Sequence, residues 1–203
     1  RNNGGGLLDE AVEIANFFLP RGKTLVTTKG KTKQASNTYK TLREPLDLEI
    51  PLAVLVNSAT ASASEILAGA LQDYDRAVVV GNRTFGKGLV QKPIPMPDGS
   101  MIRLTVARYY TPTGRSIQKP YVNGNQEQYN HDLIDRYNRG ELMSADSIHF
   151  PDSMKYNTLE TKRIVYGGGG IMPDVFIPVD TSRYTDYHRS VVALSLIHIS
   201  EPT

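Results

Sequence analysis

The chain has 203 residues, 39% of them apolar and 22% charged, which is ordinary for a globular protein. Its formal net charge is only +2, so charge alone gives no reason to expect nucleic acid or an anionic membrane as a partner. The absence of cysteine excludes disulfides, thiol catalysis and thiolate metal sites. No apolar stretch reaches the roughly 18 residues that cross a bilayer.

The first part of the chain opens with a glycine-rich turn at residues 1–6. The apolar residues from Leu7 to Leu19 then recur at the spacing of a helix. A short β-prone run at 24–28 is followed by a polar stretch. Because the chain does not begin with Met, we expect it to be a piece of a longer protein, and we expect the turn at 1–6 to follow a strand that this piece lacks.

Two apolar runs with a helical segment between them form the most informative part of the sequence. Leu52–Val56 and Val78–Val80 show no polar alternation, which is typical of strands buried on both faces of a parallel sheet. The residues between them, up to about Tyr74, have helical spacing. Strand, helix and strand in this order predict a right-handed βαβ crossover unit.

The texture then changes to short alternating runs. Three such runs predict strands at 89–95, 101–107 and 109–111, and Asp98-Gly99 supplies a hairpin turn between the first two. We therefore expect antiparallel strands beside the crossover unit and assign residues 1–120 to one core.

The remaining sequence divides into three parts. Residues 121–163 are polar and indicate an insertion or surface excursion, with room for a short helix at 132–141. Residues 164–194 are expected to return to the core, with a strand at 175–178. Residues 195–203 have no link to the preceding pattern, and we expect them to be a non-native tail.

A serine stands at the strand-to-helix turn of the crossover unit. Ser62-Ala-Ser-Glu65 matches a capping box, in which Glu65 reaches back to the cap backbone. The same position lies beside free N–H groups and the positive end of the helix dipole. Ser62 could therefore also be a nucleophile, with the Ala63 N–H as an oxyanion donor. Three neighbouring hydroxyls are competing candidates for the nucleophile: those of Ser58, Thr60 and Ser64. Spacing alone does not decide among the four.

Lys87 lies between two glycines that permit a tight backbone, so its amine could turn inward rather than stay solvated. Only a neutral amine can take the proton of a serine, and apolar neighbours favour that form. Gln91 could hold the amine by a hydrogen bond. A carboxylate beside the lysine would favour its charged form, so we expect Asp73 to play a structural role.

Other motifs are weaker. Gly4–Gly6 is either a plain turn or a second oxyanion donor, oriented by Asn2 and Asn3. The glycine run at 167–170 lacks the ending of a phosphate loop. A Ser-His-Asp triad is not expected, because the remaining histidines lie in polar or terminal segments: His131, His149 and His188. No metal-ligand cluster is visible in the sequence.

Together these blocks resemble the core of the carboxyl-terminal processing proteases, the tail-specific proteases of the S41 peptidase family. The resemblance covers roughly residues 1–120 and 164–180. It rests on several ordered blocks, at 1–6, 61–73, 80–91, 110–118 and 169–174.

The resemblance implies a role for each matching residue. Ser62 matches the nucleophile, Lys87 the general base, and Gln91 the residue that orients the base. Ala63 and Gly5 match the oxyanion donors. It also implies a crotonase-like α/β core of the ClpP and crotonase type, with βαβ crossover units and mixed strands.

The implied function is a serine endopeptidase that cuts proteins near their C-termini and needs no cofactor. The family resemblance further suggests a bacterial periplasm or cell envelope, a PDZ domain in the full-length protein, and a homo-oligomer. A catalytically silent tail-binding pseudoprotease or scaffold is the main alternative. A crotonase-type acyl-CoA enzyme would need acid–base groups near the glycine loop, and no obvious pair is present.

Overall fold

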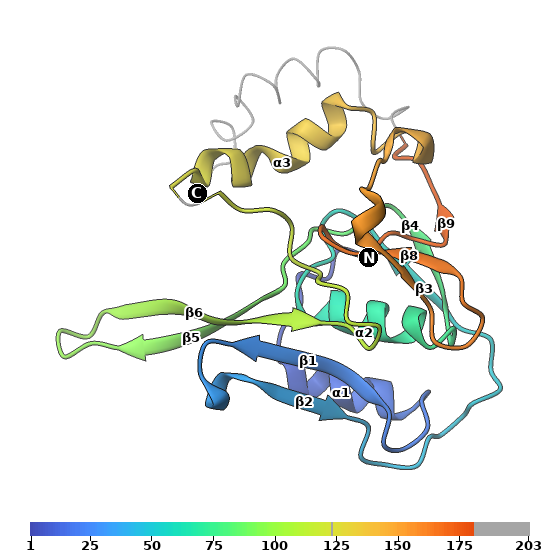
Figure 1. Ribbon diagram of the computed structural model, residues 1–203, viewed down its shortest axis with the longest axis horizontal. Helices are drawn as coiled ribbons and strands as arrows, with labels where there is room; N and C mark the ends of the chain where they lie inside the picture. The colour runs from blue at the N-terminus through green and yellow to red at the C-terminus, as the bar shows by residue number, and fades with distance from the viewer. Residues whose placement is uncertain (123, 181–203) are drawn as a thin grey trace, which may run out of the picture.

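The computed structural model describes residues 1–122 and 124–180 and shows a mixed α/β fold (Figure 1). One sheet is antiparallel, in the order β2-β1-β6-β5. A second is parallel, in the order β3-β4-β9, and a two-stranded hairpin pairs β7 with β8. The strands are β1 (Thr24–Gly30), β2 (Asn37–Lys40), β3 (Ala53–Val56), β4 (Val78–Gly81), β5 (Leu89–Pro95), β6 (Met101–Tyr110), β7 (Lys155–Asn157), β8 (Ile164–Tyr166) and β9 (Val175–Phe176).

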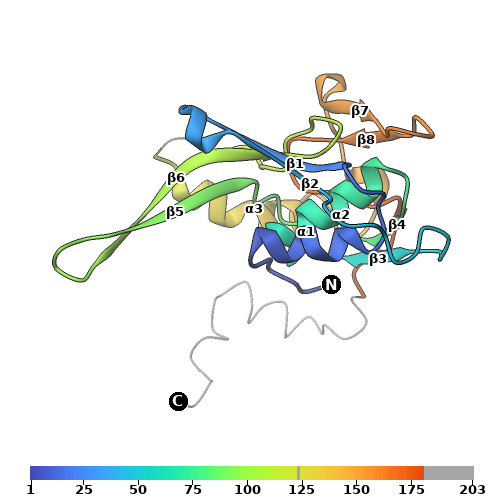
Figure 2. The same ribbon diagram turned by 90° about the horizontal axis from the view of Figure 1, so that it is seen from below.

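Helix α2 lies between the two larger sheets, and α1 packs beside it (Figures 1 and 2). One apolar cluster joins α1, α2 and β1, and a second joins α2 to β1, β3 and β4. Burial of α2 from both sides fixes the position of its N-terminus. The helices are α1 (Leu8–Asn16), α2 (Ala63–Asp73) and α3 (Gln126–Asn138), with short 3-10 turns at η1 (Lys33–Ala35), η2 (Ala145–Ser147) and η3 (Asp152–Met154).

The predicted crossover unit is confirmed. β3 and β4 are parallel neighbours, and α2 connects them. The prediction that both strands are buried on both faces is wrong, since Leu55 of β3 is 58% exposed and Val78 of β4 is 45% exposed. The helices cover one face of this sheet, and no segment in the described part of the chain buries these side chains on the other.

The alternating segment forms a long hairpin that extends away from the body of the molecule (Figure 1). β5 matches its predicted range. β6 runs on without the predicted break and continues to Tyr110, where it also pairs with β1. The register shifts between Val90 and Gln91, so the strand changes its pairing just after the candidate lysine.

The polar segment after residue 120 contains α3, which begins earlier than the sequence indicated, and the unpredicted β7–β8 hairpin. No helix of the described residues is long and apolar enough to cross a membrane. The expected non-native tail at 195–203 lies outside the described residues, as do His188 and the last part of the predicted core.

Candidate active site

Ser62 occupies a strained position at the N-terminus of α2. Its φ of 59° and ψ of −122° lie outside the regions that side-chain-bearing residues normally adopt. Such a conformation costs on the order of 1–3 kcal/mol and persists only where the surrounding structure enforces it. Residues 57–62, called here the serine turn, hold this geometry between the end of β3 and the first turn of α2.

The glycine loop packs directly on Ser62. Gly5 has a φ of +94°, and a Cβ atom placed on it would lie 2.8 Å from the Cβ of Ser62 and 2.9 Å from the nitrogen of Ala63. A side chain is excluded at this position by conformation and by space. The structure therefore brings together three of the predicted site residues.

Asparagines anchor the glycine loop, as the sequence suggested. The carbonyl oxygen of Asn3 accepts the Ala61 N–H at 3.0 Å. Asn57 accepts the Asn2 N–H at 3.0 Å and donates its amide to the Asn2 side chain at 2.5 Å. These contacts join the loop to the serine turn from both sides.

The two predicted oxyanion donors differ in their hydrogen bonding. The Gly5 N–H donates to Oδ1 of Asn3 at 3.0 Å, inside its own loop. The Ala63 N–H belongs to the first turn of α2 and has no hydrogen-bond partner within the described residues. Of the two, Ala63 is the donor already available to a ligand.

Glu65 connects the serine turn to the lysine loop, defined here as residues 84–87. Its Oε2 atom accepts the backbone N–H groups of Ser62 and Lys87, each at 2.8 Å. Its Oε1 atom accepts the Gly86 N–H at 2.7 Å and the Thr84 hydroxyl at 2.5 Å. The predicted capping contact is present, but the same carboxylate also holds a segment some twenty residues away.

This carboxylate is completely buried. Burial raises its pKa, while hydrogen bonds from Thr84, Lys87, Gly86 and Ser62 act in the opposite direction. Four donors converge on two oxygens, so each oxygen is required as an acceptor.

One further contact fixes the lysine loop to the serine turn. The Phe85 N–H donates to the carbonyl oxygen of Thr60 at 3.0 Å. Three successive N–H groups, those of residues 85 to 87, therefore point toward the serine turn and the start of α2. Gly86, with a φ of +88°, supplies the backbone conformation that this arrangement requires.

The Lys87 side chain is half-buried, and its amine has no hydrogen-bond partner among residues 1–122 and 124–180. The predicted hydrogen bond from Gln91 is not formed in this structure. Gln91 is exposed on β5, immediately after the register shift. Its orienting role stays a prediction.

An apolar groove of about 220 Å³ begins at the glycine loop and runs between α1 and α2. Gly5 and Ala63 lie at one end of it, so it starts where the oxyanion donors are predicted. The apolar side chains that line it are Leu7, Ala11, Ile14 and Leu67, with Glu10 the charged residue among its lining.

Asp73 has the structural surroundings that we expected. It lies at the opposite end of α2 from Ser62, paired with the fully buried Arg115 at 2.7 Å. It also accepts the N–H and hydroxyl of Thr113, at 3.0 and 2.9 Å. These contacts occupy the carboxylate away from Lys87.

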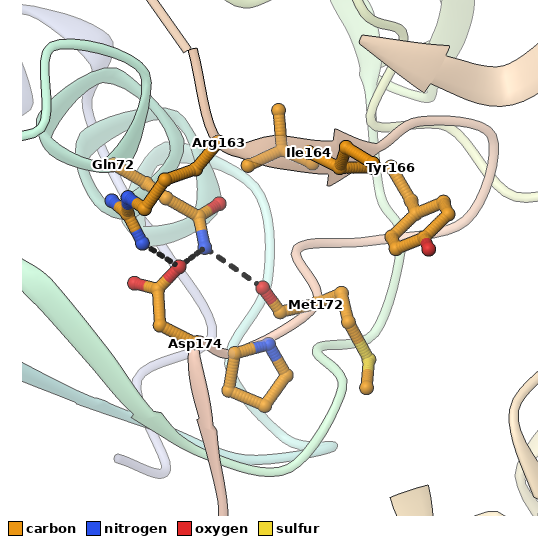
Figure 3. Close-up of a pocket in the computed structure, with 8 residues that line it drawn as sticks. Gln72, Arg163, Ile164, Tyr166, Met172 and Asp174 are labelled. Atoms are coloured by element: carbon orange, nitrogen blue, oxygen red, sulfur yellow. Dashed lines mark hydrogen bonds and ion pairs between the residues drawn. The ribbon is translucent and has the colours of Figure 1, made fainter. Parts of the chain in front are cut away.

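A second cavity, of about 210 Å³, lies near that same end of α2 (Figure 3). Asp174 accepts hydrogen bonds from Gln72 at 2.9 Å and from Arg163 at 2.7 Å. Gln72 also donates to the Met172 carbonyl at 2.9 Å. The polar groups that line this cavity bond to one another and connect the end of α2 to the segments around residues 163 and 174.

Neither a triad nor a metal site forms in the described structure. His131 and His149 are exposed, as expected. No cluster of metal-ligating side chains occurs in the described part of the chain. In the glycine run at 167–170, three N–H groups donate to backbone carbonyls, namely those of Gly167, Gly168 and Gly170. These N–H groups therefore do not form a phosphate cradle.

The sequence did not predict the roles of three residues at the site. It indicates Glu65 only as a helix cap and gives no signal for the contact of the Thr84 hydroxyl. Arg136 of α3, in the segment expected to be a surface excursion, is 1% exposed and donates to the lysine loop. An arginine within a helical pattern gives no local signal of such a contact.

The serine turn, the glycine loop and the lysine loop therefore form one candidate active site. A sequence model described as "Peptidase family S41" matches residues 1–127, which is more than half of the chain. The chain belongs to peptidase family S41.

Its relatives carry names of the same kind. It is 46% identical over 135 residues to the "Probable CtpA-like serine protease" of Staphylococcus aureus (strain N315), covering 64% of this chain and 27% of that protein. It is 47% identical over 118 residues to the "Carboxy-terminal-processing protease" of Bartonella bacilliformis, covering 58% and 27%. The chain thus spans about a quarter of the length of these curated relatives.

One solved structure is similar to this chain in both sequence and fold. The photosystem II D1 C-terminal processing protease matches with a TM-score of 0.57 and 34% identity, covering 88% of this chain and 33% of that one. This similarity supports the mixed α/β arrangement described above.

Proposed function

We propose that the protein carrying this chain is a serine endopeptidase that cleaves proteins near their C-termini, with Ser62 as nucleophile and Lys87 as base. The observation that carries the proposal is the buried Glu65 carboxylate, which accepts both the Ser62 and the Lys87 N–H at 2.8 Å. It links the serine turn to the lysine loop. A serine beside backbone N–H groups that could stabilise an oxyanion suits acyl transfer.

In this mechanism neutral Lys87 removes the proton from the Ser62 hydroxyl. The alkoxide attacks the carbonyl carbon of the scissile peptide bond, and the negative charge passes to the carbonyl oxygen. The Ala63 N–H donates a hydrogen bond to that oxyanion and stabilises it. An N–H of the glycine loop becomes the second donor once its hydrogen bond within the loop is broken. The protonated lysine gives its proton to the leaving amine, and water then hydrolyses the acyl-enzyme with Lys87 again as base.

The apolar groove between α1 and α2 fits the substrate side of this proposal. It begins at the oxyanion donors, so a side chain next to the scissile bond would enter it. Its apolar lining favours aliphatic side chains over charged ones. We therefore propose unfolded or flexible tails with an aliphatic residue before the cut as the substrate class.

Three wider features belong to the same proposal. The core is crotonase-like, which agrees with the parallel crossover unit around α2. A PDZ domain elsewhere in the full-length protein would present substrate tails, and the enzyme would work in the periplasm or at the cell envelope of a bacterium. These features rest on family resemblance.

The test uses the full-length protein that carries this chain. It is incubated with an unfolded protein that has an apolar C-terminal tail, and the products are followed by mass. We expect the wild type to release C-terminal fragments, and both Ser62→Ala and Lys87→Ala to release none. Tail binding without cleavage by any of the three would contradict the peptidase proposal and favour a pseudoprotease.

A further inference from the structure

The lysine loop is held on a second side, opposite the serine turn, by a residue from outside the family-matched region. The N–H groups of residues 85–87 face Glu65 and Thr60, as described above. Two of its carbonyl groups face α3, where Arg136 donates from Nη1 to the Thr84 oxygen at 2.7 Å and from Nη2 to the Phe85 oxygen at 3.2 Å. The carbonyl of Gly86 instead accepts the backbone N–H of Lys119 at 2.9 Å. The segment before Lys87 is therefore held on both sides, with Arg136 bonded to residues 84 and 85 and Lys119 bonded to Gly86.

Arg136 is itself fixed by its surroundings. Asp132, one helical turn earlier, forms an ion pair with its Nη2 atom at 3.0 Å. The same carboxylate pairs with Lys119 at 3.2 Å, and the Lys119 amine lies over the rings of Phe85 and Tyr129, at 4.2 and 4.1 Å from their centres. Two buried cations thus share one carboxylate beside the lysine loop.

Fold stability gives little reason for this arrangement. Removing a guanidinium from water is costly, and a buried ion pair is often no better than well-packed apolar side chains. The backbone carbonyls of the lysine loop supply the hydrogen bonds that make the buried guanidinium tolerable. What the arrangement adds is a rigid connection between α3 and the residues preceding Lys87.

We infer that Arg136 is a positioning residue for Lys87, and that α3 is a structural part of the active site rather than a surface excursion. The inference rests on the proposed function. Arginine suits the role because its planar group donates along two directions to successive carbonyls, whereas a lysine at this position offers a single point charge. Asp132 supports Arg136 in the same geometry.

The experiment compares Arg136→Lys, Arg136→Met and Asp132→Asn in the full-length protein. Arg139→Met is the matched control, since it removes a guanidinium just after the same helix. The Arg139 side chain is 54% exposed and contacts Glu141, not the lysine loop. Two measurements are made on folded protein: steady-state kinetics of a tail peptide, which give kcat and KM, and amide hydrogen exchange of the peptide covering residues 84–88.

We expect both arginine variants to lower kcat by between about tenfold and a hundredfold, as displacement of a catalytic group by about 1 Å does. KM should change little, because α3 does not line the apolar groove. Exchange at residues 85–87 should become faster while α2 stays protected. Asp132→Asn should show a smaller effect in the same direction, and Arg139→Met should match the wild type.

A merely structural arginine would change the melting temperature but leave kcat per folded molecule and the local exchange as they are, and that result would overturn the inference. If Arg136→Met does not fold, the lysine variant decides. Hydrogen exchange can be measured whether or not the protein cleaves a substrate. Absence of cleavage by the wild type would therefore count against the proposed function, while unchanged exchange in both arginine variants would count against the role of Arg136.

Discussion

The carboxylate of Glu65 is hydrogen-bonded to the backbone of Lys87: its Oε2 atom accepts the Lys87 N–H at 2.8 Å. This contact joins the first turn of α2 to a loop some twenty residues later in the chain. Glu65, which caps the N-terminus of α2, therefore also holds the backbone of the candidate base, Lys87. Any change to this carboxylate should act on both halves of the site at once.

Glu65→Gln is expected to abolish peptidase activity and to lower the free energy of unfolding by about 2–4 kcal/mol. Both carboxylate oxygens accept two donors, so the amide NH₂ of glutamine faces two donors in either orientation. Denaturant unfolding and turnover would measure the effect, beside the exposed Glu49→Gln as control. Wild-type turnover in Glu65→Gln would show that the contact is dispensable.

The glycine loop offers a comparison between neighbours. Gly5→Ala is expected to lose activity, because its Cβ would lie 2.6 Å from the Ala61 carbonyl oxygen and 2.8 Å from the Ser62 Cβ. Gly6→Ala, where a Cβ meets nothing within 4 Å, should keep most of it. Steady-state cleavage by the two variants is the measurement, and equal activity would contradict the close packing of Gly5 on Ser62.

Substrate preference should depend on the groove between α1 and α2. Ile14→Glu places a charge in its lining and is expected to lower kcat/KM about tenfold for peptides with an aliphatic residue before the cut. Phe17→Glu, at the C-terminal cap of the same helix but outside the groove, is the control. A similar loss in both variants would mean that the groove does not receive the substrate.

Acid sensitivity should involve Asp75. Burial of this carboxylate opposes its ionisation, but hydrogen bonds from Thr161, Thr158 and Arg163 outweigh it and lower the pKa to about 2 from 3.8. Because the pKa is lower in the folded state, the stabilisation is complete above about pH 4 and is lost as the pH falls toward 2. Asp75→Asn should therefore melt below the wild type at neutral pH, with a difference that shrinks between pH 4 and pH 2. A difference independent of pH would contradict this assignment.

The local parts of this site could be predicted from the sequence. Residues 62–65 form a cap within one helical turn, and the apolar runs around α2 have the pattern of a crossover unit. The contacts of Glu65 with Gly86 and of Arg136 with Thr84 could not be predicted, since they join residues that only packing brings together. The exposed face of β3 was missed because an unbroken apolar run does not reveal whether a second layer covers it.

The central claim is that Ser62 is the nucleophile and Lys87 its base. The most direct measurement is to treat the full-length protein with a fluorophosphonate and to locate the adduct by peptide mass spectrometry, beside Lys87→Ala and the surface variant Lys92→Ala. We predict a single adduct on Ser62 that forms in the wild type and in Lys92→Ala but not in Lys87→Ala. An adduct on Ser58 or Ser64, or undiminished labelling of Ser62 in Lys87→Ala, would contradict the account.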